Sequence, residues 1–172
     1  MDWLSYQIDL QVTWQEALLR LGLALVLGIL IGWEREAHNK PAGLKTMSLV
    51  ALGSAAFTLI TFEIYQAVLR VNPQSNSDPI RLVEGIIGGI GFLGAGAIIQ
   101  GRGSVHGVTT AAGIWITGAI GIACGGGHYF LAVLTWLLTM LVLLPLKFFE
   151  KKLLRGKNHH DARRETPDSI DD

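Results

Sequence analysis

Three ionisable side chains lie within apolar stretches of this chain, at ends that the charge pattern described below places outside the cell: Arg20, Glu63 and Glu84. An ionisable group inside a membrane segment is costly to place there, and it therefore suggests a functional site. Glu63 and Glu84 could supply oxygen ligands to a divalent cation, and Mg²⁺ suits carboxylates that leave several of its waters in place. The plainer interpretation is interfacial snorkelling, or an ion pair of Arg20 with either glutamate. Water available at the boundary favours the plainer interpretation.

A second polar group is expected at the opposite, cytoplasmic end. Glu34-Arg35-Glu36 closes the first apolar stretch, and Pro41-Ala-Gly-Leu-Lys-Thr46 opens the second. The fourth stretch begins on the same side, and a helix N-terminus attracts anionic groups such as Glu34 or Glu36. The predicted cluster contains Glu34, Arg35, Glu36, Lys45, Thr46, Thr109 and Thr110. It is either a hydrogen-bonded lock between helices or a functional site, because buried polar networks serve both purposes.

Other kinds of chemistry find no support in the sequence. There is no Ser-His-Asp arrangement, Walker loop or zinc signature, so an enzyme is not expected. Gly89-x-Gly91-x-x-Gly94 matches the dinucleotide fingerprint formally, but no strand precedes it. Cys124 is the only cysteine and cannot form an internal disulfide. The formal net charge is zero, which gives no indication of nucleic acid as a partner. Mg²⁺ is the only cofactor to consider.

The elements that must position these residues are membrane helices. A spanning helix needs about 20 mostly apolar residues, and only 16% of this chain is charged. Five apolar stretches qualify, at Trp14–Trp33, Thr46–Tyr65, Leu82–Ile99, Val108–Cys124 and Tyr129–Phe149. The predicted fold class is all-α, a polytopic membrane bundle of five transmembrane helices.

Charge placement predicts the orientation of this bundle. With the N-terminus outside, the loops at Glu34–Lys45 and Gln100–Gly107 and the C-terminal tail face the cytoplasm and hold most of the Lys and Arg residues. Only Arg70 and Arg81 remain in the outer segments. This bias follows the positive-inside rule and predicts N-out and C-in. Residues 1–19 lack Lys and Arg, so no cleavable signal peptide is expected.

The chain is expected to form one transmembrane domain, residues 1–149, followed by a charged and partly disordered cytoplasmic tail, residues 150–172. The segment Gln66–Pro79 is predicted to be an irregular loop. Asp78-Pro79 is predicted to start the third helix, because Asp78 can cap free N–H groups and Pro79 fits the first helical position.

Glycine is concentrated in the predicted third and fourth helices. The third helix holds Gly85, Gly88, Gly89, Gly91, Gly94 and Gly96. Small residues let helix backbones approach closely in lipid, so these two helices are predicted to form the tight centre of the bundle. The alternative is a helix break at Gly91–Gly96, whose free carbonyls could line an ion site. Exposed glycine-rich faces also favour self-association into a symmetric homo-oligomer.

Three ordered blocks give the chain a family resemblance. Gly28-Ile-Leu-Ile-Gly-Trp-Glu-Arg-Glu36 with Pro41-Ala-Gly-Leu-Lys-Thr46 resembles the first signature of the MgtC/SapB (YhiD-like) membrane protein family. Asp78-Pro-Ile-Arg81 leading into Gly89-Ile-Gly-Phe-Leu-Gly-Ala-Gly96 resembles the second. Val105-His-Gly-Val-Thr-Thr-Ala-Ala112 resembles the third. The resemblance covers roughly residues 18–145.

The resemblance implies a protein of the bacterial inner membrane that is linked to magnesium limitation and, in some members, to virulence. It implies either Mg²⁺ transport or a regulatory contact with another membrane complex such as the F-type ATP synthase. The motif residues carried over are Glu34, Arg35, Glu36, Pro41, Gly43, Asp78, Arg81, Gly91, Gly94, Gly96, Thr109 and Thr110. Two departures are expected: the ACT-like domain of longer members is absent from this chain, and Glu84 stands where the family pattern favours a small residue.

Overall fold

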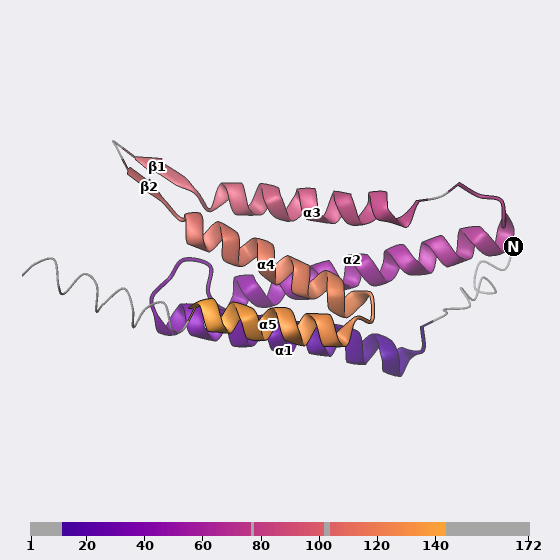
Figure 1. Ribbon diagram of the computed structural model, residues 1–172, viewed down its shortest axis with the longest axis horizontal. Helices are drawn as coiled ribbons and strands as arrows, with labels where there is room; N and C mark the ends of the chain where they lie inside the picture. Colours follow the sequence, from indigo (N-terminus) through magenta and orange to yellow (C-terminus); the bar gives the residue numbers. More distant parts are fainter. Residues whose placement is uncertain (1–11, 77, 102–103, 144–172) are drawn as a thin grey trace, which may run out of the picture. The chain divides into compact units, whose positions relative to one another are not determined.

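Seven elements make up the part of the chain that the computed structural model describes, which is residues 12–76, 78–101 and 104–143. They are α1 (Trp14–Ala37), α2 (Leu44–Val71), α3 (Pro79–Gly96), β1 (Ile99–Gly101), β2 (Ser104–His106), α4 (Val108–Gly125) and α5 (Tyr129–Leu143). The helices α1 to α4 lie alongside one another, with α2 in contact with α1, α3 and α4 (Figure 1). The predictions for residues 1–11 and for the charged tail lie outside the described residues.

The chain divides into two compact units, residues 1–136 and 137–172. The first unit holds α1 to α4 and the beginning of α5. Of the second unit, the structure describes the remainder of α5, up to Leu143. The fifth predicted span, Tyr129–Phe149, therefore lies only partly within the described residues.

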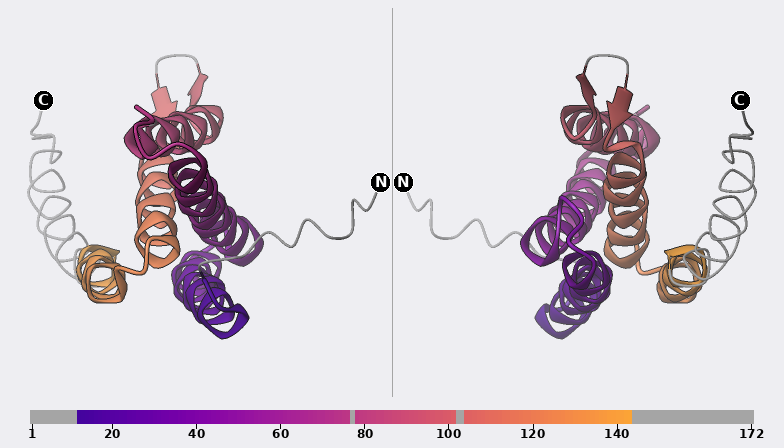
Figure 2. Two further views of the ribbon diagram at one scale, coloured as in Figure 1. Left: turned by 90° about the vertical axis from the view of Figure 1, so that its right-hand side faces the viewer. Right: turned by 90° about the vertical axis from the view of Figure 1, so that its left-hand side faces the viewer.

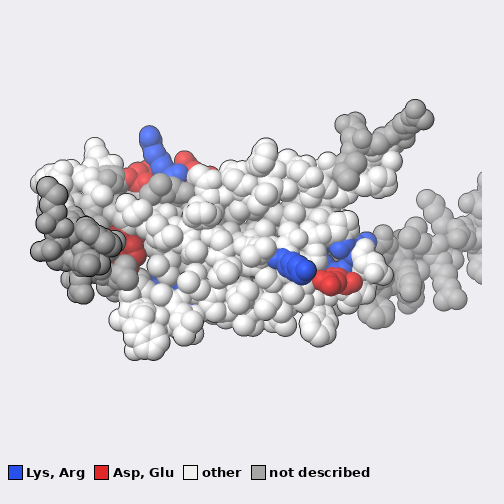
Figure 3. All heavy atoms as spheres, turned by 180° about the vertical axis from the view of Figure 1, so that it is seen from behind, with Lys and Arg blue, Asp and Glu red and all other residues white. Residues whose placement is uncertain are grey.

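Four helices among the described residues are long and apolar enough to cross a membrane. They are α1 with 24 residues, α2 with 28, and α3 and α4 with 18 each, while the described part of α5 is a shorter apolar helix. On the face shown in Figure 3, charged side chains gather toward the two ends of the helices and leave an uncharged band between them. A bilayer requires this distribution, because charge at its centre is costly. The predicted fold class, an all-helical membrane bundle, is confirmed.

Local sequence explains where the helices begin. The Thr13 hydroxyl accepts a hydrogen bond from the Glu16 backbone N–H at 3.3 Å and caps α1. The Asp78 carboxylate accepts from the Ile80 N–H at 2.9 Å, with Pro79 in the first helical position of α3. Before α4, Gly107 adopts a φ of 89°, and a Cβ there would collide with the Ala97 carbonyl oxygen. Only glycine fits that turn.

Two predicted boundaries are wrong. Helix α2 continues to Val71, so the predicted loop Gln66–Pro79 is helical over its first six residues. Residues 66–71 contain no glycine or proline to end the helix, and Pro73 is the first breaker. The predicted span to Ile99 also ends early, because α3 stops at Gly96.

The segment Gln100–Gly107, predicted as a cytoplasmic loop, largely forms a β-hairpin. Strands β1 and β2 pair antiparallel, with Ile99 opposite His106 and Gly101 opposite Ser104. The hairpin extends beyond the adjoining ends of α3 and α4 (Figure 1).

The closest packing in the bundle is that of α2 against α1 and against α4, rather than that between α3 and α4 as predicted. A Cβ at Gly28 of α1 would lie 2.9 Å from the Met47 carbonyl oxygen of α2. Gly121 and Gly125 of α4 approach the α2 backbone at Ala51 and Ala55 in the same way. Helix α3 lies on the far side of α2 and α4 from α1 (Figure 2). The position of each glycine relative to its neighbours, rather than the number of glycines, therefore decides which helices pack closely.

The glycines of α3 mostly lack neighbours. Among the described residues, a Cβ would meet nothing within 4 Å at Gly85, Gly88, Gly89, Gly91 and Gly96. Gly94 is the exception, because its Cβ would lie 3.4 Å from the Ala111 carbonyl oxygen of α4. The helix is continuous through this stretch, so the alternative of a break at Gly91–Gly96 is wrong.

Candidate functional site

The guanidinium of Arg35 is the centre of the polar site at the end of α1. Arg35 is 2% exposed. Its Nε donates to the Ala42 carbonyl at 3.0 Å, and its Nη2 donates to the Pro41 carbonyl at 2.8 Å and to the Thr110 hydroxyl at 2.7 Å. One side chain therefore joins α1, the following loop and the first turn of α4. We call this group, Arg35 with Pro41, Ala42 and Thr110, the arginine node.

No carboxylate among the described residues lies within ion-pair distance of the Arg35 guanidinium. The close contacts between a basic and an acidic side chain found there are Arg20 with Glu16 and His38 with Glu34. Carbonyl and hydroxyl oxygens instead stabilise the buried guanidinium, whose planar fork matches several acceptors at once. Burying a charge is costly unless its donors are hydrogen-bonded, so these three acceptors are essential to the placement of Arg35.

The loop after α1 is bent so that its carbonyls face Arg35. Asn39 and Ala42 adopt positive φ angles of 52° and 55°. The Lys40 N–H donates back to the Arg35 carbonyl at 3.0 Å and closes the turn. A left-handed conformation costs an alanine about 1–2 kcal/mol. The hydrogen bond from Arg35 to the Ala42 carbonyl offsets that cost.

Glu36 connects the same loop to α2. Its Oε2 accepts a hydrogen bond from the Leu44 backbone N–H at 3.0 Å, which caps the start of α2. A Cβ at Gly43 would lie 2.9 Å from that Oε2, so glycine leaves room for the cap. The Glu34 carboxylate does not contact this loop-to-α2 cap; it lies 3.0 Å from Nδ1 of His38, the residue that follows α1.

The structure brings together part of the predicted cytoplasmic cluster. Arg35 meets Thr110, and Glu36 meets the first residue of α2. Lys45, Thr46 and Thr109 are exposed and lie outside the arginine node. Sequence reasoning missed the carbonyls of Pro41 and Ala42, because every residue carries one and no residue type marks those that are used.

Gly113 is a further residue that sequence reasoning missed. Its Cβ would lie 3.3 Å from Nη1 of Arg35, so a side chain there would press on the guanidinium. The available signal was its spacing, because Gly113 follows Thr110 by three residues and shares its helix face.

The two carboxylates of the predicted outer cation site, Glu63 and Glu84, lie on α2 and α3. No group of three or more His, Cys, Asp or Glu side chains suited to a metal lies within the described part of the chain. Glu63 Oε1 accepts a hydrogen bond from the Val12 N–H at 2.9 Å, and Glu84 is exposed on α3.

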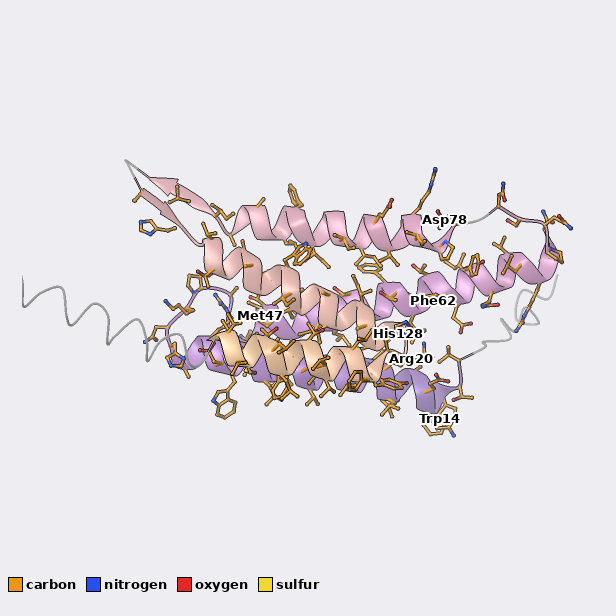
Figure 4. The ribbon with its side chains drawn as sticks, in the orientation of Figure 1. Trp14, Arg20, Met47, Phe62, Asp78 and His128 are labelled. Atoms are coloured by element: carbon orange, nitrogen blue, oxygen red, sulfur yellow. The ribbon has the colours of Figure 1, made fainter. Side chains whose placement is uncertain are left out.

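Arg20 instead binds the end of α4. Its Nη1 donates to the Gly125 carbonyl at 2.8 Å, and its Nη2 pairs with Glu16. Figure 4 shows Arg20 and His128 close together beside the turn that follows α4. A cation at a helix C-terminus interacts favourably with the helix dipole. Arg20 therefore stabilises the bundle rather than serving Glu63 or Glu84.

One exposed face of α3 carries a carboxylate. Glu84, Gly88 and Gly91 are four and three residues apart, so they lie on the same face of the helix. Glu84 is exposed, and the two glycines have no described neighbour within 4 Å of a Cβ. Arg81 near the helix start is exposed as well. A charged side chain on such a face needs water, a lipid headgroup or another protein chain beside it.

Replacing Thr110 with valine should destabilise the protein by about 1.5–3 kcal/mol, the usual value for a hydrogen bond to a charged group. The valine keeps the shape of threonine but leaves the Arg35 Nη2 with one acceptor fewer. Thermal unfolding in detergent measures the effect. Thr109→Val is the matched control, because Thr109 is the preceding residue and is exposed. Equal melting temperatures for the two variants would contradict the role assigned to Thr110.

These features define the class of protein. Four helices are long and apolar enough to cross a membrane, their charges gather toward the ends, and a buried arginine joins three segments at one end. This is a helical membrane protein. The sequence profile of the MgtC family matches residues 21–152, and the chain belongs to that family.

Relatives from several bacteria share this sequence. The chain is 37% identical over 145 residues to "Putative magnesium transporter YhiD" of Escherichia coli K12, which covers 84% of this chain and 66% of the relative. It is 40% identical over 126 residues to an uncharacterized protein of Haemophilus influenzae, covering 73% of this chain and 52% of the relative. It is 39% identical over 133 residues to "Protein SapB" of Bacillus subtilis 168, covering 73% and 52%. The chain thus spans half to two thirds of the length of these relatives. No solved structure matches it.

Proposed function

We propose that this chain is a multi-pass protein of the bacterial inner membrane, oriented N-out and C-in, that moves Mg²⁺ across the bilayer along a path between copies of itself. The name of the Escherichia coli relative, which describes it as a putative magnesium transporter, supports the choice of ion. The charge distribution of the sequence supports the orientation.

The exposed carboxylate of Glu84 is the observation that carries this proposal. Glu84 lies five residues after Pro79, which places it about 7.5 Å inside the start of α3. An intramembrane carboxylate that faced lipid would be costly, so its exposure favours a neighbouring chain or a water-filled path. Carboxylates that leave the waters of Mg²⁺ in place suit the entrance of such a path.

The interior of the single bundle is a poor route for a cation. Arg20 and Arg35 lie within it toward opposite ends, and each repels a divalent cation. The buried hydroxyls of Ser54, Thr58 and Thr117 donate to carbonyls of their own helices, four residues back, and carry no negative charge to offset the two arginines. A path along α3, between copies, avoids both arginines.

Replacing Glu84 with glutamine should lower Mg²⁺ flux about tenfold or more, the effect of losing about 1.4 kcal/mol of attraction for the ion. The measurement is Mg²⁺ uptake into sealed liposomes that contain the purified protein, compared with empty liposomes. Glu84→Asp is the control, because it keeps the charge and should retain most of the flux.

Flux at the level of empty liposomes from folded and inserted wild-type protein would refute the transport proposal. That result would favour the alternative function, a regulatory contact with another membrane complex. The next experiment would then identify the proteins that copurify with this chain. Normal flux from Glu84→Gln would leave transport in place and refute the assigned path.

A further inference from the structure

An apolar groove separates α2 from α3 and has no assigned role. Its volume is about 760 Å³, within the range of ligand-binding pockets. Leu49, Phe57 and Ile60 of α2 line one wall, and Ile86 and Leu93 of α3 line the other. Glycines at 53, 85 and 89 widen the groove, because none of them has a described neighbour within 4 Å of a Cβ. The groove lies on a different face of α3 from Glu84, which does not line it.

Among the described residues, one charged residue lines the groove, and it lies at one end. Lys45 and Thr46 line the end where α2 begins, and both are exposed. Within the described residues, neither side chain has a hydrogen bond or ion pair. Glu36, the nearest acidic residue along the chain, caps Leu44 and is not part of the lining. The ammonium of Lys45 is therefore available to an anion.

The remainder of the groove offers little to a polar ligand. The Ser54 hydroxyl donates to the Val50 carbonyl of its own helix at 2.7 Å. Thr61 lies at the other end, sixteen residues from Lys45, or about 24 Å along the helix. A long apolar trough with a cation at one end is complementary to a molecule with an anionic head and a long hydrocarbon chain.

We propose that this groove binds an anionic phospholipid, with an acyl chain between α2 and α3 and the phosphate on Lys45. The source of the ligand is the bilayer itself. The start of α2 is cytoplasmic in the predicted orientation, and anionic lipids attract cations at that surface. The first turn of α2 adds the N-terminal end of a helix dipole beside Lys45, which favours a phosphate at the same place.

Lipid retention by the purified protein tests this proposal. Phosphatidylglycerol and phosphatidylcholine with identical acyl chains are supplied in equal amounts, and native mass spectrometry counts the lipids of each kind that stay bound. Wild-type protein should retain phosphatidylglycerol preferentially. Lys45→Gln should reduce that preference about fivefold, the value that corresponds to about 1 kcal/mol per cation near an anionic surface. Lys40→Gln removes an exposed cation of the loop before α2 that does not line the groove, and it should leave the preference unchanged.

A second pair of variants tests the groove independently of charge. Gly89→Leu places a side chain in the groove and should reduce retention of both lipids. Gly91→Leu is the matched control, because Gly91 has equally open surroundings but does not line the groove. A melting curve for each variant confirms that it is folded.

Two results would overturn the proposal. One is unchanged lipid selectivity in Lys45→Gln together with unchanged retention in Gly89→Leu. The other is a wild-type dimer that carries no lipid and that Gly89→Leu converts to a monomer, which would show that a second copy of the chain occupies the groove.

Discussion

Replacing Arg35 with alanine should remove most of the folded protein from a detergent extract. The substitution leaves the carbonyls of Pro41 and Ala42 and the hydroxyl of Thr110 without their shared donor. A buried acceptor left without its partner typically costs about 1–3 kcal/mol, and three acceptors lose the same donor here. Many proteins have a total stability of only about 5–15 kcal/mol, so the loss is a large part of the whole. Size-exclusion chromatography for yield and thermal unfolding for stability measure it.

Two further variants separate the roles of charge and geometry at Arg35. Lys40→Ala removes an exposed cation from the same loop and should change stability by less than about 0.5 kcal/mol. Arg35→Lys keeps the charge but loses the planar fork that reaches three acceptors, so its stability should fall between wild type and Arg35→Ala. Normal yield and melting of Arg35→Ala would contradict the structural role of the arginine node and would favour a functional role for this residue.

The helices of this protein could be predicted from sequence because their signals are local. Apolar runs of about 20 residues marked the spans, and the Asp78-Pro79 pair marked the start of α3. The end of α2 was missed because hydrophobicity falls before the helix ends. Gln66 and Arg70 are polar, yet both are good helix formers, so the helix continues to Val71.

The packing of the helices could not be predicted in the same way, because it depends on which surfaces meet. Helix α3 has the densest glycine sequence but mostly open surroundings. Gly28 and Gly121 belong to α1 and α4, which contain fewer glycines than α3, yet each lies directly against α2. The spacing of glycines shows that a close approach is possible and does not name the partner helix.

The candidate site was predicted only where side chains meet side chains. Arg35 and Thr110 were both in the expected cluster, and the structure joins them. The main acceptors of Arg35 are backbone carbonyls presented by a loop with two positive φ angles, at Asn39 and Ala42. Neither the carbonyls nor the positive φ of an alanine has a residue-type signature.

Replacing Gly121 with leucine should abolish folding, whereas the same change at Gly91 should be tolerated. A Cβ at Gly121 would press on the Ala51 carbonyl oxygen and lie 2.8 Å from Cβ of Ser54, both on α2. Overpacking a core costs about 1–3 kcal/mol when side chains can adjust. Here the nearest atom is backbone, so a leucine must force α4 away from α2 and disrupt the centre of the bundle. Folded yield and circular dichroism of the purified variants measure the outcome.

Gly91→Leu makes this a test of packing rather than of glycine content. Both substitutions add the same side chain to an apolar helix and remove the same helix-weakening residue. They differ in surroundings, because Gly91 has no described neighbour within 4 Å of a Cβ. A folded Gly121→Leu protein would show that α2 and α4 are farther apart than the structure has them. Self-association of the wild-type protein that is lost in a folded Gly91→Leu protein would identify the open face of α3 as the contact between copies. This face is next to the carboxylate of Glu84, on which the proposed Mg²⁺ path depends.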